Sequence, residues 1–330
     1  MEHALVVEDL HTVFHTQDGA IHAVNGVSFS LKPGELLGVV GESGSGKSVS
    51  MMSLLKLVPM PPAEITSGRA VFEGEDLLAL SPDRLRRLRG DKIGFIFQDP
   101  MTSLNPVFTV GYQLTEPLRI HRGLDKKAAR ARAAELLSLV GIPDAERRLR
   151  DFPHQFSGGM RQRVMIAMAL ACDPKVLIAD EPTTALDVTV QAQIIEIVKN
   201  LRETFGTAIV WITHDLGVVA GIADHVAVMY GGQIVEYADV ASLYDDPRHP
   251  YTRALLQTLP ADGTGARERL ASIPGQAPTL DAPLSACPFA ARCEHVHERC
   301  LAENPPLFTV SASQKSRCWL EAEGKAEVAA

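Results

Sequence analysis

Short apolar runs alternate with amphipathic stretches over about the first 245 residues of the chain. Each run is bounded by turn residues or by charges, which is typical of buried strands. The strands predicted in this way are Glu35–Val40, Lys92–Asp99, Lys175–Asp180 and Thr207–Asp215.

The stretches between these runs have helical patterning and end at a glycine, as in Lys126–Gly141 and Val188–Gly206. Strands that alternate with helices predict an α/β fold with a mainly parallel sheet covered on both faces. The segment His225–Ala238 predicts a strand, a Gly-Gly turn and a second strand.

The chain divides into three predicted parts. Residues 1–259 form a nucleotide-binding domain, residues 260–283, which are rich in proline, glycine and alanine, form a linker, and residues 284–320 form a four-cysteine tail. Such a short tail builds little core, so we expect metal ligation to supply its folding energy. We also expect loss of a tail cysteine to leave nucleotide binding by the cassette largely intact.

Composition describes an ordinary globular protein, with 46% hydrophobic and 22% charged residues. A net charge of −8 argues against a large nucleic-acid footprint, so no nucleic-acid partner is expected. The first residues lack the pattern of a signal peptide, and the longest apolar run, Val164–Cys172, is too short to span a bilayer. We therefore expect a cytoplasmic chain, where clustered cysteines favour metal or redox chemistry over disulfides.

The segment GESGSGKS, Gly41–Ser48, fits the phosphate-binding motif G-x4-G-K-S/T. It follows a predicted strand and precedes a helical pattern, which is the context that the motif requires. Lys47 is expected to reach the β- and γ-phosphates of ATP, and Ser48 to bind Mg²⁺. The candidate nucleotide-binding residues here are Gly41, Ser43, Gly44, Ser45, Gly46, Lys47, Ser48 and Val49.

Asp180 ends the predicted strand VLIAD, and Glu181 follows it directly. Asp180 is placed to hold Mg²⁺, directly or through water, and Glu181 is a candidate general base for the attacking water. The alternative is that the pair caps the helix that follows.

A third motif is FSGGMRQR, Phe156–Arg163. It resembles the signature motif of ABC-transporter ATPases, and further segments match motifs of that family in the family's order. They are Gln98 (Q-loop, also a Mg²⁺ and catalytic candidate), Ala185–Asp187 (D-loop), His214 (catalytic switch histidine) and Phe14 (adenine stacking).

This resemblance implies a cassette with a RecA-like core, an antiparallel β subdomain and an α-helical subdomain, followed here by the cysteine tail. It also implies that Ser157, Gly158 and Gly159 contact the γ-phosphate of ATP bound to an opposing subunit. Phe156 and Met160 replace the usual leucine and glutamine of the signature, and Met160 cannot supply the amide hydrogen bonds of glutamine. The signature of this chain completes the ATP site of the opposing subunit. That ATP site is therefore expected to differ from the other ATP site of the dimer.

Further segments resemble the dipeptide/oligopeptide importer branch: Gln98–Gln113, Leu186–Ile194, His249–Leu256 and Ile273–Leu280. That branch implies a second ATPase subunit, here a paralogue, two membrane permeases and an extracytoplasmic binding protein, with this chain peripheral on the cytoplasmic face of the membrane. Residues 101–113 are expected to dock on the permease, with Val107, Phe108 and Val110 as apolar contacts. The alternative is a soluble single-cassette ABC ATPase with a regulatory or nucleic-acid-related role.

Each single residue also has a simpler interpretation. Phe14 is then part of the core, Gln98 a solvated loop residue, and His214 the cap of a helix that starts near Leu216. Cys172 ends an apolar helical pattern and is interpreted as a small buried hydrophobe.

The tail holds four of the five cysteines: Cys287, Cys293, Cys300 and Cys318. Four thiolates suit a tetrahedral Zn²⁺ site or a [4Fe–4S] cluster. Close C-x2-4-C pairs, common in structural zinc sites, are missing, and the resembling branch can hold a cluster in this tail. The predicted cofactor is the [4Fe–4S] cluster, with zinc second and unligated or disulfide-linked thiols third.

Overall fold

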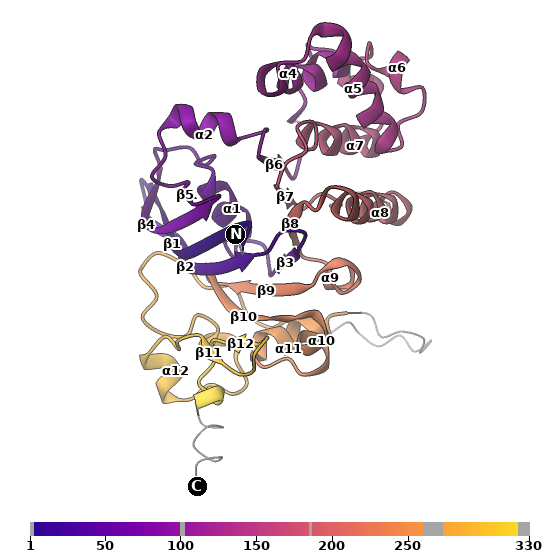
Figure 1. Ribbon diagram of the computed structural model, residues 1–330. Coiled ribbons are helices and arrows are strands. Elements are labelled where there is room, and N and C mark those ends of the chain that lie inside the picture. Colours follow the sequence, from indigo (N-terminus) through magenta and orange to yellow (C-terminus); the bar gives the residue numbers. More distant parts are fainter. Residues whose placement is uncertain (1–2, 100–102, 185–186, 260–272, 323–330) are drawn as a thin grey trace, which may run out of the picture. The chain divides into compact units, whose positions relative to one another are not determined.

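The computed structural model describes residues 3–99, 103–184, 187–259 and 273–322 (Figure 1). Its contacts form two compact units, and each is described by itself. Unit 1 comprises residues 1–5, 31–36 and 79–212, and unit 2 comprises residues 6–30, 37–78 and 213–330.

Unit 2 contains a four-stranded sheet with the order β2-β1-β4-β5. Long strands with alternating buried and exposed positions make up most of it, as expected for a sheet with one covered face. Its strands are β1 (Leu5–Thr16), β2 (Gly19–Leu31), β4 (Ala63–Phe72) and β5 (Glu75–Asp76).

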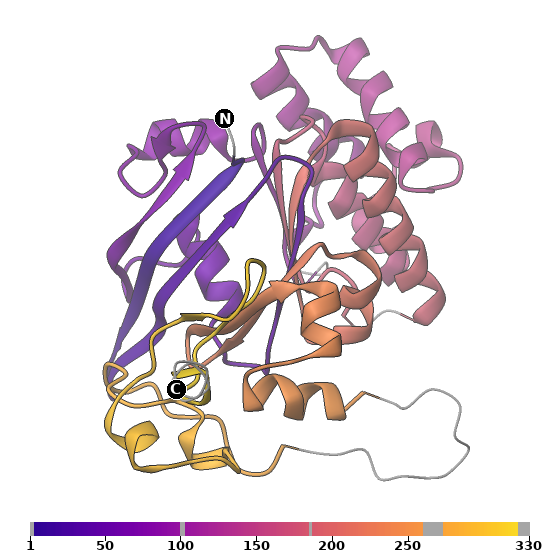
Figure 2. The same cartoon turned by 60° about the horizontal axis from the view of Figure 1, so that its bottom comes forward.

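A second run of strands in unit 2 has the order β11-β12-β10-β9-β3. It consists of β3 (Leu36–Val40), β9 (His225–Tyr230), β10 (Gln233–Asp239), β11 (Phe308–Thr309) and β12 (Lys315–Ser316). β3 and β9 are parallel, whereas β9, β10, β12 and β11 pair antiparallel in turn. The tail of the chain therefore lies beside β10, as Figure 2 shows in yellow and orange.

The helices of unit 2 are mostly short. They are α1 (Lys47–Leu54), α9 (Leu216–Ile222), α10 (Val240–Asp245), α11 (Pro250–Gln257), the 3₁₀ turn η2 (Ala290–Arg292) and α12 (Glu298–Ala302). One core cluster joins β9 and β10 to α11 and the tail, because Tyr230, Tyr251 and Phe289 pack together with ring centroids 4.5–5.3 Å apart.

Unit 1 contains three parallel strands in the order β8-β7-β6. They are β6 (Ile93–Ile96), β7 (Val176–Asp180) and β8 (Ala208–Thr213), and every residue of β7 and β8 is buried. Burial on both faces explains why these strands read as continuous apolar runs.

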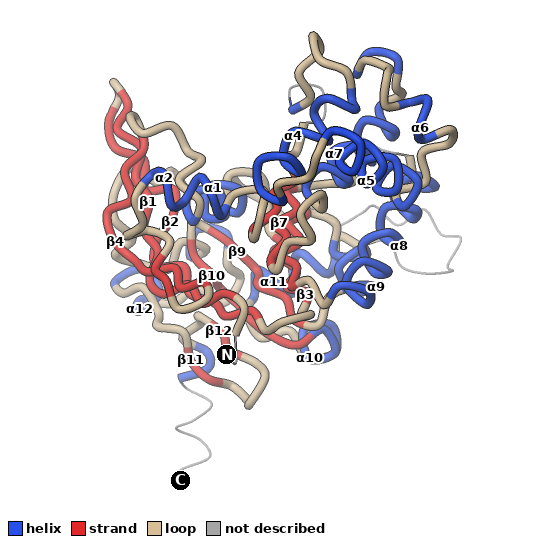
Figure 3. Tube along the Cα trace, turned by 45° about the horizontal axis from the view of Figure 1, so that its top comes forward, coloured by secondary structure: helices blue, strands red, loops and turns tan. Residues whose placement is uncertain are grey.

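The helices of unit 1 are the blue segments labelled α4 to α8 in Figure 3, together with α2, which Figure 1 labels. They are α2 (Pro82–Leu88), α4 (Val110–Arg122), α5 (Lys126–Leu139), α6 (Ala145–Arg148), η1 (Pro153–Gln155), α7 (Gly158–Ala169) and α8 (Val188–Phe205). Side-chain oxygens of Thr109, Asp125, Ser157 and Asp187 cap α4, α5, α7 and α8. None of the helices in the described part of the chain combines the length and hydropathy needed to cross a bilayer.

The sequence-based expectation of an α/β fold is confirmed. Each predicted apolar run contains a strand, the segment after Gly46 is a helix, and the Gly-Gly segment forms the β9–β10 hairpin. Glycines with positive φ follow α5 and α8, as predicted, at Gly141 and Gly206. Residues 273–283, the described part of the predicted linker, contain no helix or strand.

Candidate functional site

The loop Gly41–Ser48 of unit 2 connects β3 to α1, as its motif requires. Gly41 has a φ of 151°, and an added Cβ would lie 2.2 Å from the carbonyl oxygen of Met229. Gly46 has a φ of 95°, and a Cβ there would lie 2.5 Å from the carbonyl oxygen of Ala23. Only glycine fits at these two positions, so the tight curl of the backbone is built into the sequence.

Lys47 lies at the start of α1 and is 5% exposed. Its ammonium group donates to the carbonyl oxygens of Gly41 (2.7 Å) and Glu42 (2.9 Å). The hydroxyl of Ser45 is buried without a hydrogen-bond partner in the described structure. A cation and an open hydroxyl beside a glycine loop at a helix N-terminus fit the phosphates of a nucleotide.

The other predicted positions of the loop are more open. Ser43 and Gly44 are exposed, Ser48 and Val49 are half-buried, and no atom lies within 4 Å of a Cβ added at Gly44. Phe14 is half-buried on β1, so its side chain is accessible in part.

Unit 1 brings two further predicted residues together. The side-chain nitrogen of Gln98 donates to Glu181 Oε2 (3.0 Å), and the Thr184 hydroxyl donates to the same oxygen (2.9 Å). Asp180, the last residue of β7, is 4% exposed, and Glu181 has a φ of 47°. Two side-chain donors therefore fix the orientation of the Glu181 carboxylate.

The simpler interpretations of the acidic pair and of His214 do not fit the observed caps. The helix after Glu181 is α8, and its capping side chain is Asp187. Likewise α9 is capped by Asp215, while His214 is exposed directly after β8. Within the described residues, α8 and α9 are capped by Asp187 and Asp215 and not by Asp180, Glu181 or His214.

The signature segment of unit 1 begins α7. Ser157 is the N-cap and accepts from the backbone N–H of Met160 (3.3 Å), and both Ser157 and Gly158 are exposed. Phe156 is 3% exposed, with the Arg148 guanidinium 5.5 Å from its ring centroid. The unusual Phe156 therefore still acts as an apolar anchor for the exposed turn.

The predicted D-loop and docking segment are each described only in part. Ala185 and Leu186 of the D-loop lie outside the described residues, as does Met101 of the docking segment. Val110 was expected to be an apolar contact for a permease, and this is wrong: it is fully buried because it starts α4 and faces the helical core. Val107 and Phe108 are 70% and 42% exposed, as that expectation requires.

The four tail cysteines line one small cavity, together with Phe289 and Trp319 among other residues. Burial raises the pKa of Cys287 to about 11 and that of Cys318 to about 12, and neighbouring tail cysteines contribute to both. Within the described ranges, no set of three or more His, Cys, Asp or Glu side chains forms a group that could hold a metal ion. Cys172 is fully buried, as expected of a small hydrophobe.

Two contacts at the glycine loop were missed from the sequence. Arg292 of the tail forms an ion pair with Glu42, and the backbone N–H of Glu42 donates to the Tyr251 hydroxyl (2.9 Å). The only hints in the sequence were the motif around Tyr251 and the arginine just before Cys293, and neither identifies a partner.

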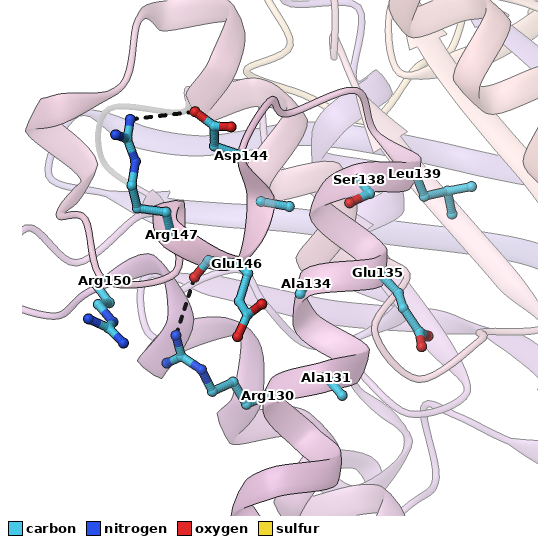
Figure 4. Close-up of a pocket in the computed structure, with 11 residues that line it drawn as sticks. Arg130, Ala131, Ala134, Glu135, Ser138, Leu139, Asp144, Glu146, Arg147 and Arg150 are labelled. Atoms are coloured by element: carbon cyan, nitrogen blue, oxygen red, sulfur yellow. Dashed lines mark hydrogen bonds and ion pairs between the residues drawn. The ribbon is translucent and has the colours of Figure 1, made fainter.

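A surface hollow of unit 1 lies on α5 and α6 (Figure 4). Its charges are mixed: Arg147 pairs with Asp144 (3.6 Å), and Arg130 donates to the carbonyl oxygen of Glu146 (3.2 Å). It contains none of the predicted site residues.

Comparison with known proteins identifies the family. The ABC transporter family matches residues 24–184, and the C-terminal region of oligopeptide/dipeptide transporters matches residues 235–300. The chain is 53% identical over 316 residues to the oligopeptide transport ATP-binding protein OppD of Bacillus subtilis (strain 168), covering 96% of this chain and 88% of the relative. The chain belongs to the ATP-binding proteins of peptide ABC transporters.

A second relative and a solved structure support this assignment. The dipeptide transport ATP-binding protein DppD of Bacillus subtilis (strain 168) is 50% identical over 322 residues, covering 97% of this chain and 96% of the relative. A dimeric ATP-binding cassette, MJ0796, solved in a post-hydrolysis state with ADP and Pi, is 30% identical with a TM-score of 0.65, and covers 72% of this chain and 98% of that structure. The chain is an ABC ATPase, and its cassette fold is confirmed.

Proposed function

We propose that the chain is the ATP-hydrolysing subunit of an importer that energises uptake of peptides, or of a related small solute, across the cytoplasmic membrane. The observation that carries the proposal is the glycine loop with its buried Lys47, on a chain whose C-terminal region matches peptide transporters. Both OppD and DppD, named for oligopeptide and dipeptide transport, align over at least 96% of this chain.

In the proposed site, the loop amides and Lys47 bind the ATP phosphates, and Phe14 stacks on adenine. Ser48, Gln98 and Asp180 would hold Mg²⁺, which would supply charge neutralisation at the phosphates when bound. Glu181 orients and deprotonates the attacking water, and the hydrogen bond from Gln98 supports its placement. His214 holds the water and the γ-phosphate.

The proposal includes a partner in each site. Ser157, Gly158 and Gly159 contact the γ-phosphate of ATP bound by a second ATPase subunit, a paralogue of this chain. The exposure of Ser157 and Gly158 at the N-terminus of α7 supports this role, because helix N-termini favour anions. ATP then closes the dimer and hydrolysis reopens it.

Two permeases and an extracytoplasmic binding protein complete the proposed complex, with this chain peripheral on the cytoplasmic face. A soluble ABC ATPase is the alternative. The test is co-expression with cognate permeases, membrane fractionation, and uptake of labelled peptides into proteoliposomes. We expect membrane association only with the permeases, and ATP-dependent uptake. A chain that stays soluble beside its permeases would contradict the proposal.

We further propose that the tail holds a [4Fe–4S] cluster on Cys287, Cys293, Cys300 and Cys318, with Zn²⁺ as the second candidate. All four cysteines line one small cavity, which favours this assignment, although their side chains in the described structure do not form a group that could hold a metal ion. The raised thiol pKa values mean that binding must displace protons, so ligation is favoured at higher pH. The group is structural, because the tail has little core of its own.

Iron analysis of anaerobically purified protein tests this assignment. We expect brown protein with about four iron atoms per chain. Cys293→Ser should lose the iron, whereas Cys172→Ala, which changes a cysteine remote in sequence, should keep it. Colourless protein with stoichiometric zinc would contradict the cluster, and metal-free protein with four free thiols would contradict both.

A further inference from the structure

Arg292, next to Cys293 in the tail, forms a bidentate ion pair with the side chain of Glu42 in the glycine loop. Its Nη1 donates to Glu42 Oε2 (2.7 Å) and its Nη2 to Glu42 Oε1 (3.0 Å). The side chain of Arg292 is 5% exposed and that of Glu42 30%. A bidentate pair of this kind fixes the relative orientation of the guanidinium and the carboxylate as well as their distance. Each of its charge-assisted hydrogen bonds is about twice as strong as a neutral hydrogen bond.

Arg292 is itself held in place. Its Nε donates to the carbonyl oxygen of Pro274 (2.8 Å), and Nη2 also donates to that of Ile273 (3.1 Å). Nη1 donates to the Tyr230 hydroxyl (3.1 Å), and the guanidinium lies 5.7 Å from the centroid of that ring. The hydrogen bond to Glu42 raises the pKa of Arg292, so this cation stays charged.

The backbone of Glu42 is also held by hydrogen bonds, so the pair with Arg292 restricts the conformation of the glycine loop. Its N–H donates to the hydroxyl of Tyr251, on α11, and its carbonyl oxygen accepts from Lys47. Burial lowers the pKa of His249 to about 3, so His249 is neutral and its Nδ1 accepts the backbone N–H of Tyr251 (3.0 Å). The side chain and the backbone N–H of Glu42 are thus held by Arg292 and Tyr251 of the C-terminal region. Its carbonyl oxygen is held by Lys47.

We propose that Arg292 is a positioning residue for ATP: by fixing Glu42 it pre-organises the glycine loop and Lys47, so nucleotide affinity depends on the folded cysteine tail. The inference rests on the proposed nucleotide role of Gly41–Ser48. A loop already held in its binding shape loses less freedom when it closes on phosphates. This replaces the expectation that nucleotide binding is largely independent of the tail.

The test is a double-mutant cycle on the full chain, with the dissociation constant of a non-hydrolysable ATP analogue as readout. We expect Arg292→Gln and Glu42→Gln each to weaken binding about tenfold, and the double variant to be no worse than either single variant. Arg299→Gln is the matched control, because this tail arginine forms an exposed pair with Glu303, and it should bind normally. Additive effects in the double variant would overturn the coupling.

A positioning role also predicts a pattern that general destabilisation does not give. In the assembled complex, Arg292→Gln should raise KM for ATP and leave kcat at saturating ATP unchanged. Arg292→Lys should recover part of the affinity, since lysine restores the charge but not the two-point geometry. Normal affinity in Arg292→Gln would overturn the proposal.

Two controls separate the possible failures. If the parent chain binds no nucleotide, or if Lys47→Ala binds nucleotide like the parent, the proposed nucleotide-binding function of the loop is wrong. Such a result says nothing against the positioning role of the Arg292–Glu42 pair. If Arg292→Gln unfolds the tail, seen as faster thiol labelling, Glu42→Gln decides, because it leaves every tail residue unchanged. Parent-like affinity in Glu42→Gln would then overturn the inference.

Discussion

Glu181 lies in a left-handed turn with a φ of 47°, and its backbone N–H donates to the carbonyl oxygen of Ile212 (3.0 Å). Both side-chain contacts of its Oε2, from Gln98 and Thr184, are donors. Such a setting suits a carboxylate that must present its charge in one direction. The strained φ is consistent with a functional position, because strain of this kind costs about 1–3 kcal/mol.

Glu181→Gln should keep ATP binding and lower hydrolysis at least ~10²-fold, because the base is lost while the size of the side chain stays. ATPase activity of the assembled complex measures this, with a binding assay on the same preparation. Glu196→Gln, which changes an exposed glutamate of α8, is the control and should hydrolyse ATP normally. Near-normal turnover in Glu181→Gln would remove Glu181 from the catalytic role.

Residue-level prediction from the sequence works where the chemistry is local. The curl of Gly41–Ser48 is encoded within eight consecutive positions, so its motif reveals it. The Arg292–Glu42 pair joins residues 250 positions apart, and no local pattern encodes such a contact. Val110 shows the same limit, since only the packing of α4 decides whether an apolar residue beside exposed Val107 and Phe108 is buried.

At the scale of elements, the buried side chain of Glu236 on β10 connects the tail and the start of α11, all within unit 2. Its Oε1 accepts from the backbone N–H of Arg248 (2.8 Å) and from Gln314 Nε2 (3.0 Å), and its Oε2 accepts from the backbone N–H of His249 (2.8 Å). Burial raises the pKa of Glu236, while these donors lower it again. Three elements therefore depend on one acceptor group.

Glu236→Gln should lower the free energy of unfolding by about 1–3 kcal/mol, because the new NH₂ faces donors and leaves one unsatisfied. Denaturant unfolding of the full chain measures the change. Glu203→Gln on the exposed side of α8 serves as the control and should shift stability little. Unchanged stability in Glu236→Gln would show that the β10 network does not hold the tail.

Helices and strands with a strong hydrophobic pattern were predictable from the sequence, and the smallest strands were not. The strands β7 and β8 are apolar up to their last residues, Asp180 and Thr213, because both faces of these strands are buried. β11 and β12 contain two residues each and form only by pairing, β12 with β10 and β11 with β12. Two residues carry no periodicity, so these strands have no signal of their own.

At the scale of the whole molecule, an ABC transporter subunit needs a surface for its membrane partner. The described part of the predicted docking segment exposes Val107 and Phe108, and Tyr112, at 48% exposure, stacks on Phe108 with ring centroids 4.7 Å apart. Exposed aromatic groups held by stacking suit an interface, because they bury large area with little loss of freedom. The side chain of Gln113 holds the turn, because its Nε2 donates to the backbone carbonyl oxygens of Asn105 and Phe108.

Phe108→Asp should therefore weaken association with the permeases several-fold and leave nucleotide binding unchanged. The turn keeps its hydrogen bonds from the Gln113 side chain, and the lost ring is already 42% exposed, so the fold should survive. The measurement is the share of the chain that co-purifies with tagged permeases from membranes. Leu301→Asp, which places the same charge on a 64% exposed tail residue, is the control and should assemble normally. Equal loss in both variants would show that added charge, and not this surface, disturbs assembly.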